Sequence, residues 1–288
     1  MPLRRDLHEA NRRSWNAATL AHNSHKGDQA AFFRAGGSTL HDEERALLGP
    51  LSGVRLVHLL CNAGQDTLSL ARLGAAATGV DISDEAVEFA RRLAAESGIA
   101  ARFERADVYD WLDEAARAGR RFEVAYASYG ALPWLSDLAA WCRGVAAVLE
   151  PGGRLVVMEF HPVLGMFDER LELRYPYFAA EEPLRWDEGV GDYVAFSGEG
   201  LAPMGYHEGV RDFRNPHPAF EFPRGMGEVV TAVLEAGLAL EVLREYPYTN
   251  GWAPFAGMRD TPDGRRWPPE GVPSLPLMFG LAARKPAK

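Results

Sequence analysis

The chain has 288 residues and carries 31 Lys and Arg against 40 Asp and Glu, a formal net charge of −9. Its apolar content of 47% and charged content of 25% are ordinary for a globular protein and exclude a mainly disordered chain. The negative charge disfavours broad binding to nucleic acids or acidic membranes. No apolar run spans a bilayer, and no secretory signal is visible, so we expect neither a nucleic-acid nor a membrane partner. Two cysteines, Cys61 and Cys142, indicate a reducing compartment, and we expect a cytoplasmic protein.

Residues 1–50 are polar and compatible with helices. A regular alternation of strand and helix patterns then runs from Val54 to about residue 160. Strands are predicted at 54–60, 76–80, 101–106, 122–128 and 154–160, with helices at 65–74, 83–98, 109–119 and 134–149. Strands that alternate with helices indicate a parallel sheet, and we predict an α/β doubly wound fold.

The alternation stops after Phe160 and returns near residue 225. Residues 161–224 are short aromatic and acidic pieces with little periodicity. A helix is predicted at 225–238, strands at 238–248 and 276–285, and a loop rich in Pro, Gly and Trp at 247–273.

The strongest functional signal lies in residues 54–83, where a buried strand, a tight turn and a helix would present backbone N–H groups to a ligand. Gly64 would let the backbone approach that ligand without a clash from a Cβ atom. Asp81 ends the next strand, where a carboxylate can accept both hydroxyls of a ribose. Asp107 and Val108 follow another strand and suit the amino group and the face of an adenine. The alternative is an ordinary strand–helix turn with an Asp helix cap.

These segments together resemble the class I S-adenosylmethionine-dependent methyltransferases, from about residue 54 to 160. The resemblance implies a Rossmann-like, seven-stranded, mostly parallel sheet with helices on both faces and an insertion after strand five. The turn departs from the usual pattern, because His58 replaces an acidic residue and Leu60 and Asn62 replace glycines. A dinucleotide pyrophosphate would need those glycines more than an uncharged methionine tail does.

The resemblance implies S-adenosylmethionine as the cofactor and a set of residues that hold it. These predicted cofactor-binding residues are Trp15, Cys61, Asn62, Gly64, Asp66, Thr67, Asp81, Ile82, Asp107, Val108 and Ser128. We predict no metal site, since His207 and His217 have no ligand partners at a recognisable spacing.

A second resemblance, to a bacterial subgroup of small-molecule methyltransferases, covers nearly the whole chain. It rests on segments such as NRRSWN, CNAGQDTLSLARLGA, SYGALPWL, EFHPV and MGEVVTAVLEAGL. It implies a single domain, 1–288, with an N-terminal helical lid at 1–50, a cofactor-binding core at 54–160, a substrate-lobe insertion at 161–224, and a C-terminal helix and strands at 225–288. Arg224 stands where this subgroup usually carries a histidine.

Two residues are candidates for catalysis because the acceptor of this fold lies above the ends of strands four and five. His161 has an intrinsic pKa that suits a general base, and the alternative is that it only bonds a loop carbonyl before Pro162. Tyr129 would line the methyl site or simply pack.

We therefore predict an enzyme that transfers a methyl group from S-adenosylmethionine to O or N of a small molecule. Residues 161–226 hold 12 acidic and 6 basic residues, and their many aromatic rings would suit a cationic or aromatic acceptor. Alternatively, those rings form a small core of their own, and the acids are solvated. The other functional hypotheses are a cofactor-binding protein without transfer activity and an NAD-dependent oxidoreductase.

Overall fold

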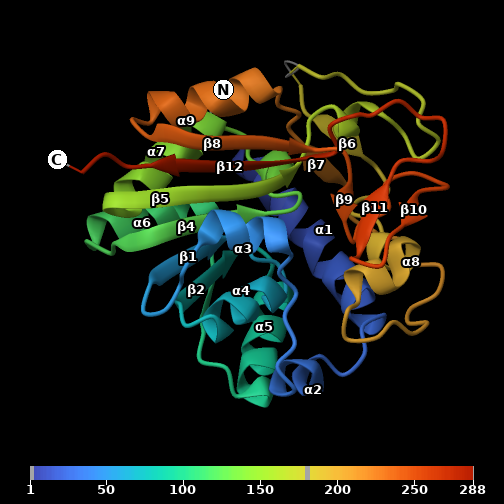
Figure 1. Ribbon diagram of the computed structural model, residues 1–288, viewed down its shortest axis with the longest axis horizontal. Helices are drawn as coiled ribbons and strands as arrows, with labels where there is room; N and C mark the ends of the chain where they lie inside the picture. Colours follow the sequence, from blue (N-terminus) through green and yellow to red (C-terminus); the bar gives the residue numbers. More distant parts are fainter. Residues whose placement is uncertain (1–2, 179–181, 288) are drawn as a thin grey trace.

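The computed structural model describes residues 3–178 and 182–287, and its centre is one seven-stranded sheet (Figure 1). The strand order is β3-β2-β1-β4-β5-β12-β8. The first five strands in that order run parallel, while β12 is antiparallel to both of its neighbours. This confirms the predicted doubly wound, Rossmann-like, mostly parallel sheet. Its strands are β1 (Arg55–Leu59), β2 (Ala76–Asp81), β3 (Arg102–Arg105), β4 (Phe122–Ser128), β5 (Leu149–Phe160), β8 (Ala239–Tyr246) and β12 (Met278–Arg284).

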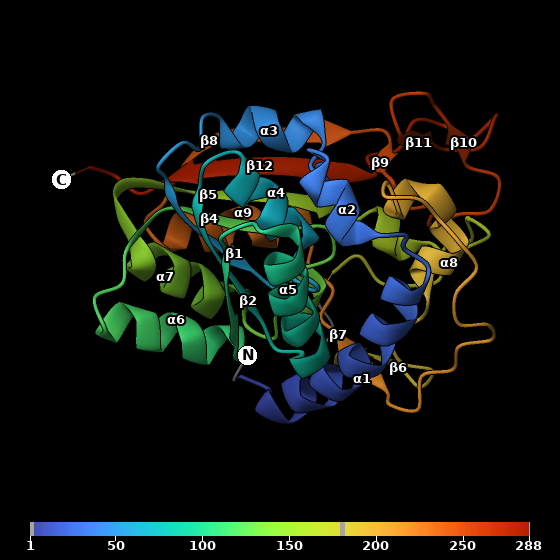
Figure 2. The same cartoon turned by 90° about the horizontal axis from the view of Figure 1, so that it is seen from below.

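Helices cover both faces of the sheet (Figure 2). One face carries α2 (Gln29–Arg34), α3 (Asp42–Leu48), α4 (Gln65–Arg72) and α5 (Asp84–Ser97). The other face carries α6 (Val108–Arg117), α7 (Leu138–Val148) and α9 (Met226–Glu235). Because both faces are covered, the central strands are mostly apolar, and β4 is buried at every position except Glu123.

Several helices begin where a short polar side chain caps them, as the sequence pattern suggests. Ser83 caps α5, Asp107 caps α6 and Asp137 caps α7. The predicted helix at 134–149 begins later than expected. Pro133 lies in a short 3-10 turn, η1 (Leu132–Trp134), and the chain enters α7 only after Asp137.

A cover lies beyond the carboxyl ends of the parallel strands and consists of α1 (Arg5–Ser24) and the inserted segment, residues 161–224 (Figure 1). Side-chain hydrogen bonds join its two parts: the Asn11 amide donates to the Phe220 carbonyl at 2.8 Å and accepts from the Phe220 N–H at 2.7 Å. The inserted segment contains η2 (Leu164–Met166), β6 (Leu184–Trp186), α8 (Tyr193–Ser197), η3 (Gly198–Leu201) and β7 (Ala219–Glu221).

The region predicted as a loop at 247–273 contains a small antiparallel sheet, ordered β10-β11-β9. The strands are β9 (Thr249–Asn250), β10 (Arg259–Asp260) and β11 (Arg265–Trp267). Strands of two or three residues are too short to show an alternating pattern, which is why sequence periodicity did not indicate them.

Candidate active site

A cavity of about 830 Å³ lies over the carboxyl ends of β1, β2, β4 and β5. Its walls come from α1, from the loops that follow these strands, from the inserted segment and from residues near β9. Ligand pockets usually occupy roughly 300–1,000 Å³, and in open α/β sheets they lie at this edge. The fold therefore places a binding site of ordinary size where the sequence predicted one.

The turn from β1 into α4 forms the floor of this cavity. Leu60, Asn62 and Gly64 all have positive φ angles, of 56°, 47° and 79°. The backbone thus adopts left-handed conformations even where the expected glycines are replaced, at some cost in strain. The Asn62 N–H donates to Asp81 Oδ2 at 2.8 Å, which joins the turn to the end of β2.

Two carboxylates follow the ends of β2 and β3 and line the cavity. Asp81 accepts the N–H groups of Asn62 and Ser83, each at 2.8 Å, and burial raises its pKa. Asp107 accepts the Tyr109 N–H at 2.9 Å and lies 2.6 Å from Nδ1 of His8 on α1. Burial opposes ionisation of Asp107, yet its hydrogen bond with His8 holds its pKa below the usual value.

A series of hydrogen-bonded polar side chains extends behind the turn to the end of β4. His58 Nδ1 lies 2.9 Å from Thr67 Oγ1, and His58 Nε2 lies 3.2 Å from Ser128 Oγ. Ser128 Oγ also donates to Asp66 at 3.3 Å. Complete burial lowers the pKa of His58 to about 4, so the ring is neutral and holds Ser128 beside the cavity.

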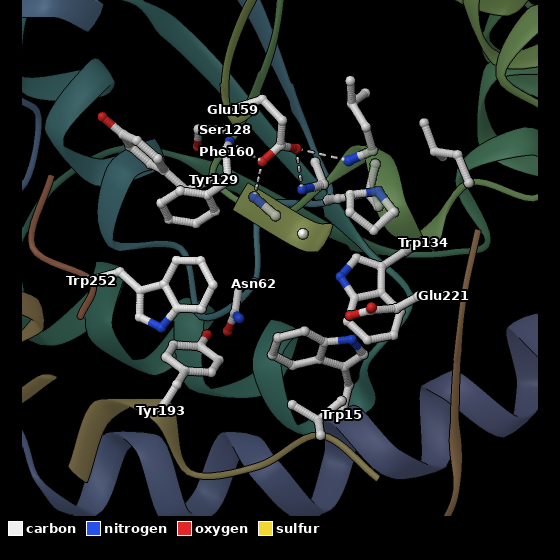
Figure 3. A pocket seen from close by; sticks show the side chains of 18 of the residues that line it. Trp15, Asn62, Ser128, Tyr129, Trp134, Glu159, Phe160, Tyr193, Glu221 and Trp252 are labelled. Atoms are coloured by element: carbon white, nitrogen blue, oxygen red, sulfur yellow. Dashed lines mark hydrogen bonds between the residues drawn. The ribbon is translucent and has the colours of Figure 1, made fainter. Parts of the chain in front are cut away.

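Aromatic rings surround the hollow above Asn62 (Figure 3). The closest pair has ring centroids 4.4 Å apart, and edge-to-face contacts dominate on the α1 side. Such rings exclude water and present flat apolar faces to a ligand. They are Trp15, Tyr129, Trp134, Phe160, Tyr193 and Trp252.

Comparison with known proteins assigns the core to a family. A family model described as a methyltransferase domain matches residues 57–153, which include the turn, Asp81, Asp107 and Ser128. Residues 57–153 therefore form a methyltransferase domain of the class I S-adenosylmethionine-dependent type, whose cofactor is S-adenosylmethionine.

Relatives and solved structures extend the likeness beyond the core. A ubiquinone biosynthesis O-methyltransferase of Xylella fastidiosa is 35% identical over 118 residues, or 41% of this chain and 46% of that protein. One of Methylocella silvestris is 28% identical over 204 residues, 70% of this chain and 66% of that protein. The alignments thus span less than two thirds of these relatives. A methyltransferase structure from Mesorhizobium loti shares the fold, with a TM-score of 0.53, 21% identity, and coverage of 83% of this chain and 94% of that one.

Two residues of the methyltransferase turn are placed differently from the prediction. Gly64 does not line the cavity, because a Cβ atom there would lie 2.6 Å from Ala90 and Phe103. The glycine makes room for core packing rather than for a ligand. Thr67 is likewise buried behind the floor, where it positions His58, while Cys61 and Asn62 do line the cavity.

His161 lines the methyltransferase cavity, and its ring nitrogens lie beside other groups of the chain. Nδ1 accepts the Val163 N–H at 3.1 Å, so the loop contact is an amide rather than the predicted carbonyl. Nε2 lies 2.8 Å from the carboxylate of Glu245 on β8. Burial lowers the pKa of His161, although Glu245 opposes that effect. Nε2 closes no hydrogen bond of normal geometry with Glu245, so the role of His161 as a base stays a prediction.

Tyr129 lies in the cavity wall with a strained backbone, at φ 42°. Its hydroxyl donates to Glu44 at 3.0 Å and accepts from the Asn250 amide at 2.9 Å. Glu44 is fully buried, and burial raises its pKa to about 8. The hydroxyl is therefore fixed by two partners, and the ring is the part of Tyr129 that a ligand would meet. The other predicted cofactor residues that line the cavity are Trp15, Asp66, Ile82, Val108 and Ser128.

Glu159 is a structural residue of the site that the sequence did not indicate. Its buried carboxylate accepts the N–H groups of Gly130, Ala131, Leu132 and Phe160 (Figure 3). These bonds hold the loop after β4 against the end of β5. A Glu that ends a buried strand was the only available signal.

Two further ionisable residues of the cavity were also missed. Lys26 follows α1, and burial lowers its pKa to about 8 although Asp66 opposes the shift. Glu221 ends β7, and burial raises its pKa to about 7. The signal for Lys26 was its rarity, since only three lysines occur in the chain.

The structure describes residues 3–178 and 182–287. No helix in these ranges is long and apolar enough to cross a membrane. No group of three or more His, Cys, Asp and Glu side chains there could hold a metal ion.

Proposed function

We propose that this methyltransferase acts on a hydroxyl oxygen of a small molecule that contains a ring. The observation that carries the proposal is the two-sided cavity, with Asn62, Asp81 and Val108 on the floor and aromatic rings opposite them. The relatives named as ubiquinone biosynthesis O-methyltransferases support oxygen as the accepting atom.

The residues present suit the cofactor. Each Asp81 oxygen accepts only one backbone N–H, which leaves lone pairs for two ribose hydroxyls. Ile82 and Val108 supply apolar surface for the adenine, beside Asp107. The Lys26 ammonium and the Ser128 hydroxyl suit the charged amino-acid end. Bound S-adenosylmethionine supplies a methyl group whose carbon leaves the sulfonium sulfur, which keeps the bonding electron pair, and bonds to the acceptor oxygen.

The chain contributes alignment and exclusion of water. The rings of Tyr129, Phe160 and Trp252 would hold the acceptor ring above the loop fixed by Glu159. A nucleophile held in line and stripped of water reacts faster than one free in solution. The hydroxyl proton passes to a nearby carboxylate or to water as the new bond forms.

The organisation around this site is also part of the proposal. Within the predicted lid at 1–50, α1 serves with residues 161–224 as a cover of a single domain, 1–288, whose core binds the cofactor, while α2 and α3 pack on one face of the sheet. Hydrogen bonds between α1 and β7 support this arrangement. We also propose a cytoplasmic location, supported by two free cysteines, Cys61 and Cys142, both buried.

Calorimetry with S-adenosylhomocysteine and NADH tests the class of ligand. We expect the purified protein to bind S-adenosylhomocysteine and not NADH. Binding of NADH without binding of S-adenosylhomocysteine would contradict the proposal and favour an oxidoreductase. Transfer of a tritiated methyl group from S-adenosylmethionine to catechols and other phenols then tests transfer activity, and binding without any transfer would favour a non-catalytic binding protein.

A further inference from the structure

Five carboxylates from the described part of the chain line the cavity, and one of them differs from the rest. Four accept hydrogen bonds from backbone N–H groups or from Ser, Thr or His side chains; these are Asp66, Asp81, Asp107 and Glu159. Glu221 accepts none of normal geometry from residues 3–178 and 182–287. A partly buried carboxylate without donors is costly unless a ligand supplies them.

The surroundings of Glu221 are aromatic. The Phe222 N–H donates to the Pro133 carbonyl at 2.7 Å, which places the end of β7 against η1. Figure 3 shows the Glu221 carboxylate between Trp134 and Trp15, directed into the hollow. The indole N–H of Trp186 on β6 favours the ionised form of Glu221, yet it closes no hydrogen bond of normal geometry. A carboxylate among indole faces is the arrangement that attracts an organic ammonium ion.

The chain's own cations do not neutralise Glu221. The guanidinium of Arg224 donates to the Ser136 carbonyl at 2.8 Å and lies 3.2 Å from Glu228 on α9. Arg185 on β6 is exposed and pairs with Asp187 at 2.7 Å. On the α1 side three titratable groups line the cavity. His8 is held by Asp107 and Ser136, and His22 bonds the Gly191 carbonyl at 2.8 Å while burial lowers its pKa to about 4. Lys26 follows α1, and the carboxylate that acts on it is Asp66.

We propose that Glu221 selects an acceptor with a protonated amine, whose ammonium pairs with the Glu221 carboxylate between Trp15 and Trp134 while its ring occupies the rest of the hollow. This inference rests on the proposed function and names the substrate class. It assigns Glu221 to recognition of a charge on the acceptor rather than to the floor that holds the cofactor.

Three phenols of nearly equal shape test the charge preference with S-adenosylhomocysteine bound. They are tyramine, which is cationic, tyrosol, its neutral alcohol analogue, and 4-hydroxyphenylacetate, which is anionic. We expect calorimetry to show tyramine bound at least about tenfold more tightly than tyrosol, and the anion bound most weakly. Equal affinities, a preference for the anion, or no binding of any probe would overturn the proposal.

A neutral variant assigns that preference to one residue. Glu221→Gln should lower the affinity for tyramine about tenfold and change the affinity for tyrosol less than about twofold. Glu188→Gln, an exposed residue of the same inserted segment, removes the same charge and should change neither. An equal loss in both variants, or none in Glu221→Gln, would also overturn the proposal.

Proton release provides a readout that does not depend on the variant. Burial raises the pKa of Glu221 to about 7, with a contribution from the nearby charge of Glu159. At about pH 6.5 much of the free protein carries a protonated Glu221, so binding an ammonium should release protons. Calorimetry in two buffers of different ionisation enthalpy measures this release, and its absence in the wild-type protein would contradict the pairing. Failure to bind S-adenosylhomocysteine would instead reject the proposed function itself.

Discussion

The core from β1 to β5 and the cover over its carboxyl edge are held together by different interactions. In the core, parallel strands pair residue by residue, as where Leu56 lies beside Val124, and apolar helices seal both faces. The cover joins α1 to the inserted segment through a small apolar cluster around Ala18, Val190 and Ala219 and through single polar side chains. Asn215 is the clearest case, since its amide donates to the carbonyl of Ser14 and to that of Val190.

This difference affects how each region responds to change. Apolar burial in the core is distributed over many side chains, so a single substitution removes a small part of it. A buried amide in the cover satisfies several backbone groups at once, and those groups have no water to replace it. We therefore expect point substitutions to loosen the cover with little effect on the core, except where a core residue meets the ligand directly.

Asp81→Ala should have the largest effect on cofactor binding. The substitution removes the proposed acceptor for the ribose hydroxyls and the acceptor for the Asn62 N–H, which bonds Asp81 in a buried setting. We expect the dissociation constant for S-adenosylhomocysteine to rise about 100-fold, or about 2.7 kcal/mol, by calorimetry.

Asp113→Ala is the matched control for this loss. Asp113 is an exposed residue of α6 that pairs with Arg117, far from the cavity lining. Its substitution should leave the dissociation constant unchanged. An Asp81→Ala protein that folds and binds normally would show that the ribose lies elsewhere.

Asn215→Ala should destabilise the cover. It leaves the Val190 carbonyl without the Asn215 donor, removes an additional hydrogen bond to the Ser14 carbonyl of α1, and frees the His217 N–H. We expect a loss of about 2 kcal/mol and a fall in Tm of about 5 °C. Limited proteolysis should cut residues 161–224 sooner than in the wild-type protein and leave the core intact.

Asp187→Ala tests whether any change in the inserted segment has this effect. Asp187 is exposed and bonds only Arg185 among the described residues, so its loss should shift Tm by less than about 1 °C. Equal destabilisation in the two variants would argue that the cover is marginally stable everywhere and that Asn215 has no special role.

The sequence predicted the core well because buried, apolar residues recur at regular intervals along its strands and helices. Each of the seven strands and the helices that face them leaves an apolar pattern within the chain, and the predicted limits of the strand at 122–128 match β4. Asp81 and Val108 could be placed at the cavity for the same reason, because the ends of parallel strands meet at one edge.

The cover could not be predicted because its contacts join distant segments through isolated side chains. The bond between Asn11 and Phe220 spans most of the chain and leaves no local pattern. Glu221 was counted only as part of an acidic segment, and its proposed role depends on indoles brought to it by α1 and η1. Gly64 shows the converse error, since a local motif suggested a ligand contact where packing against α5 decides.

Lys26→Met should weaken S-adenosylhomocysteine about tenfold by removing the proposed partner of its carboxylate. Because burial lowers the pKa of Lys26 to about 8, the free protein keeps the ammonium below that pH and loses it above. Affinity should therefore be nearly constant below about pH 8 and fall as the pH rises further. The variant should show a flatter curve by calorimetry, and identical curves would remove Lys26 from the site.

His161→Gln should have the smallest effect, which separates the structure's interpretation from the sequence-based one. Its ring contacts the Val163 N–H and Glu245, so the substitution removes a loop contact and no proposed ligand contact. We expect affinity for S-adenosylhomocysteine to change less than about twofold, and methyl transfer to a catechol to fall less than about threefold. A 100-fold slower transfer with normal folding and cofactor affinity would restore His161 as the base. In that case the imidazole ring of His161 would have to move away from Glu245 when an acceptor binds.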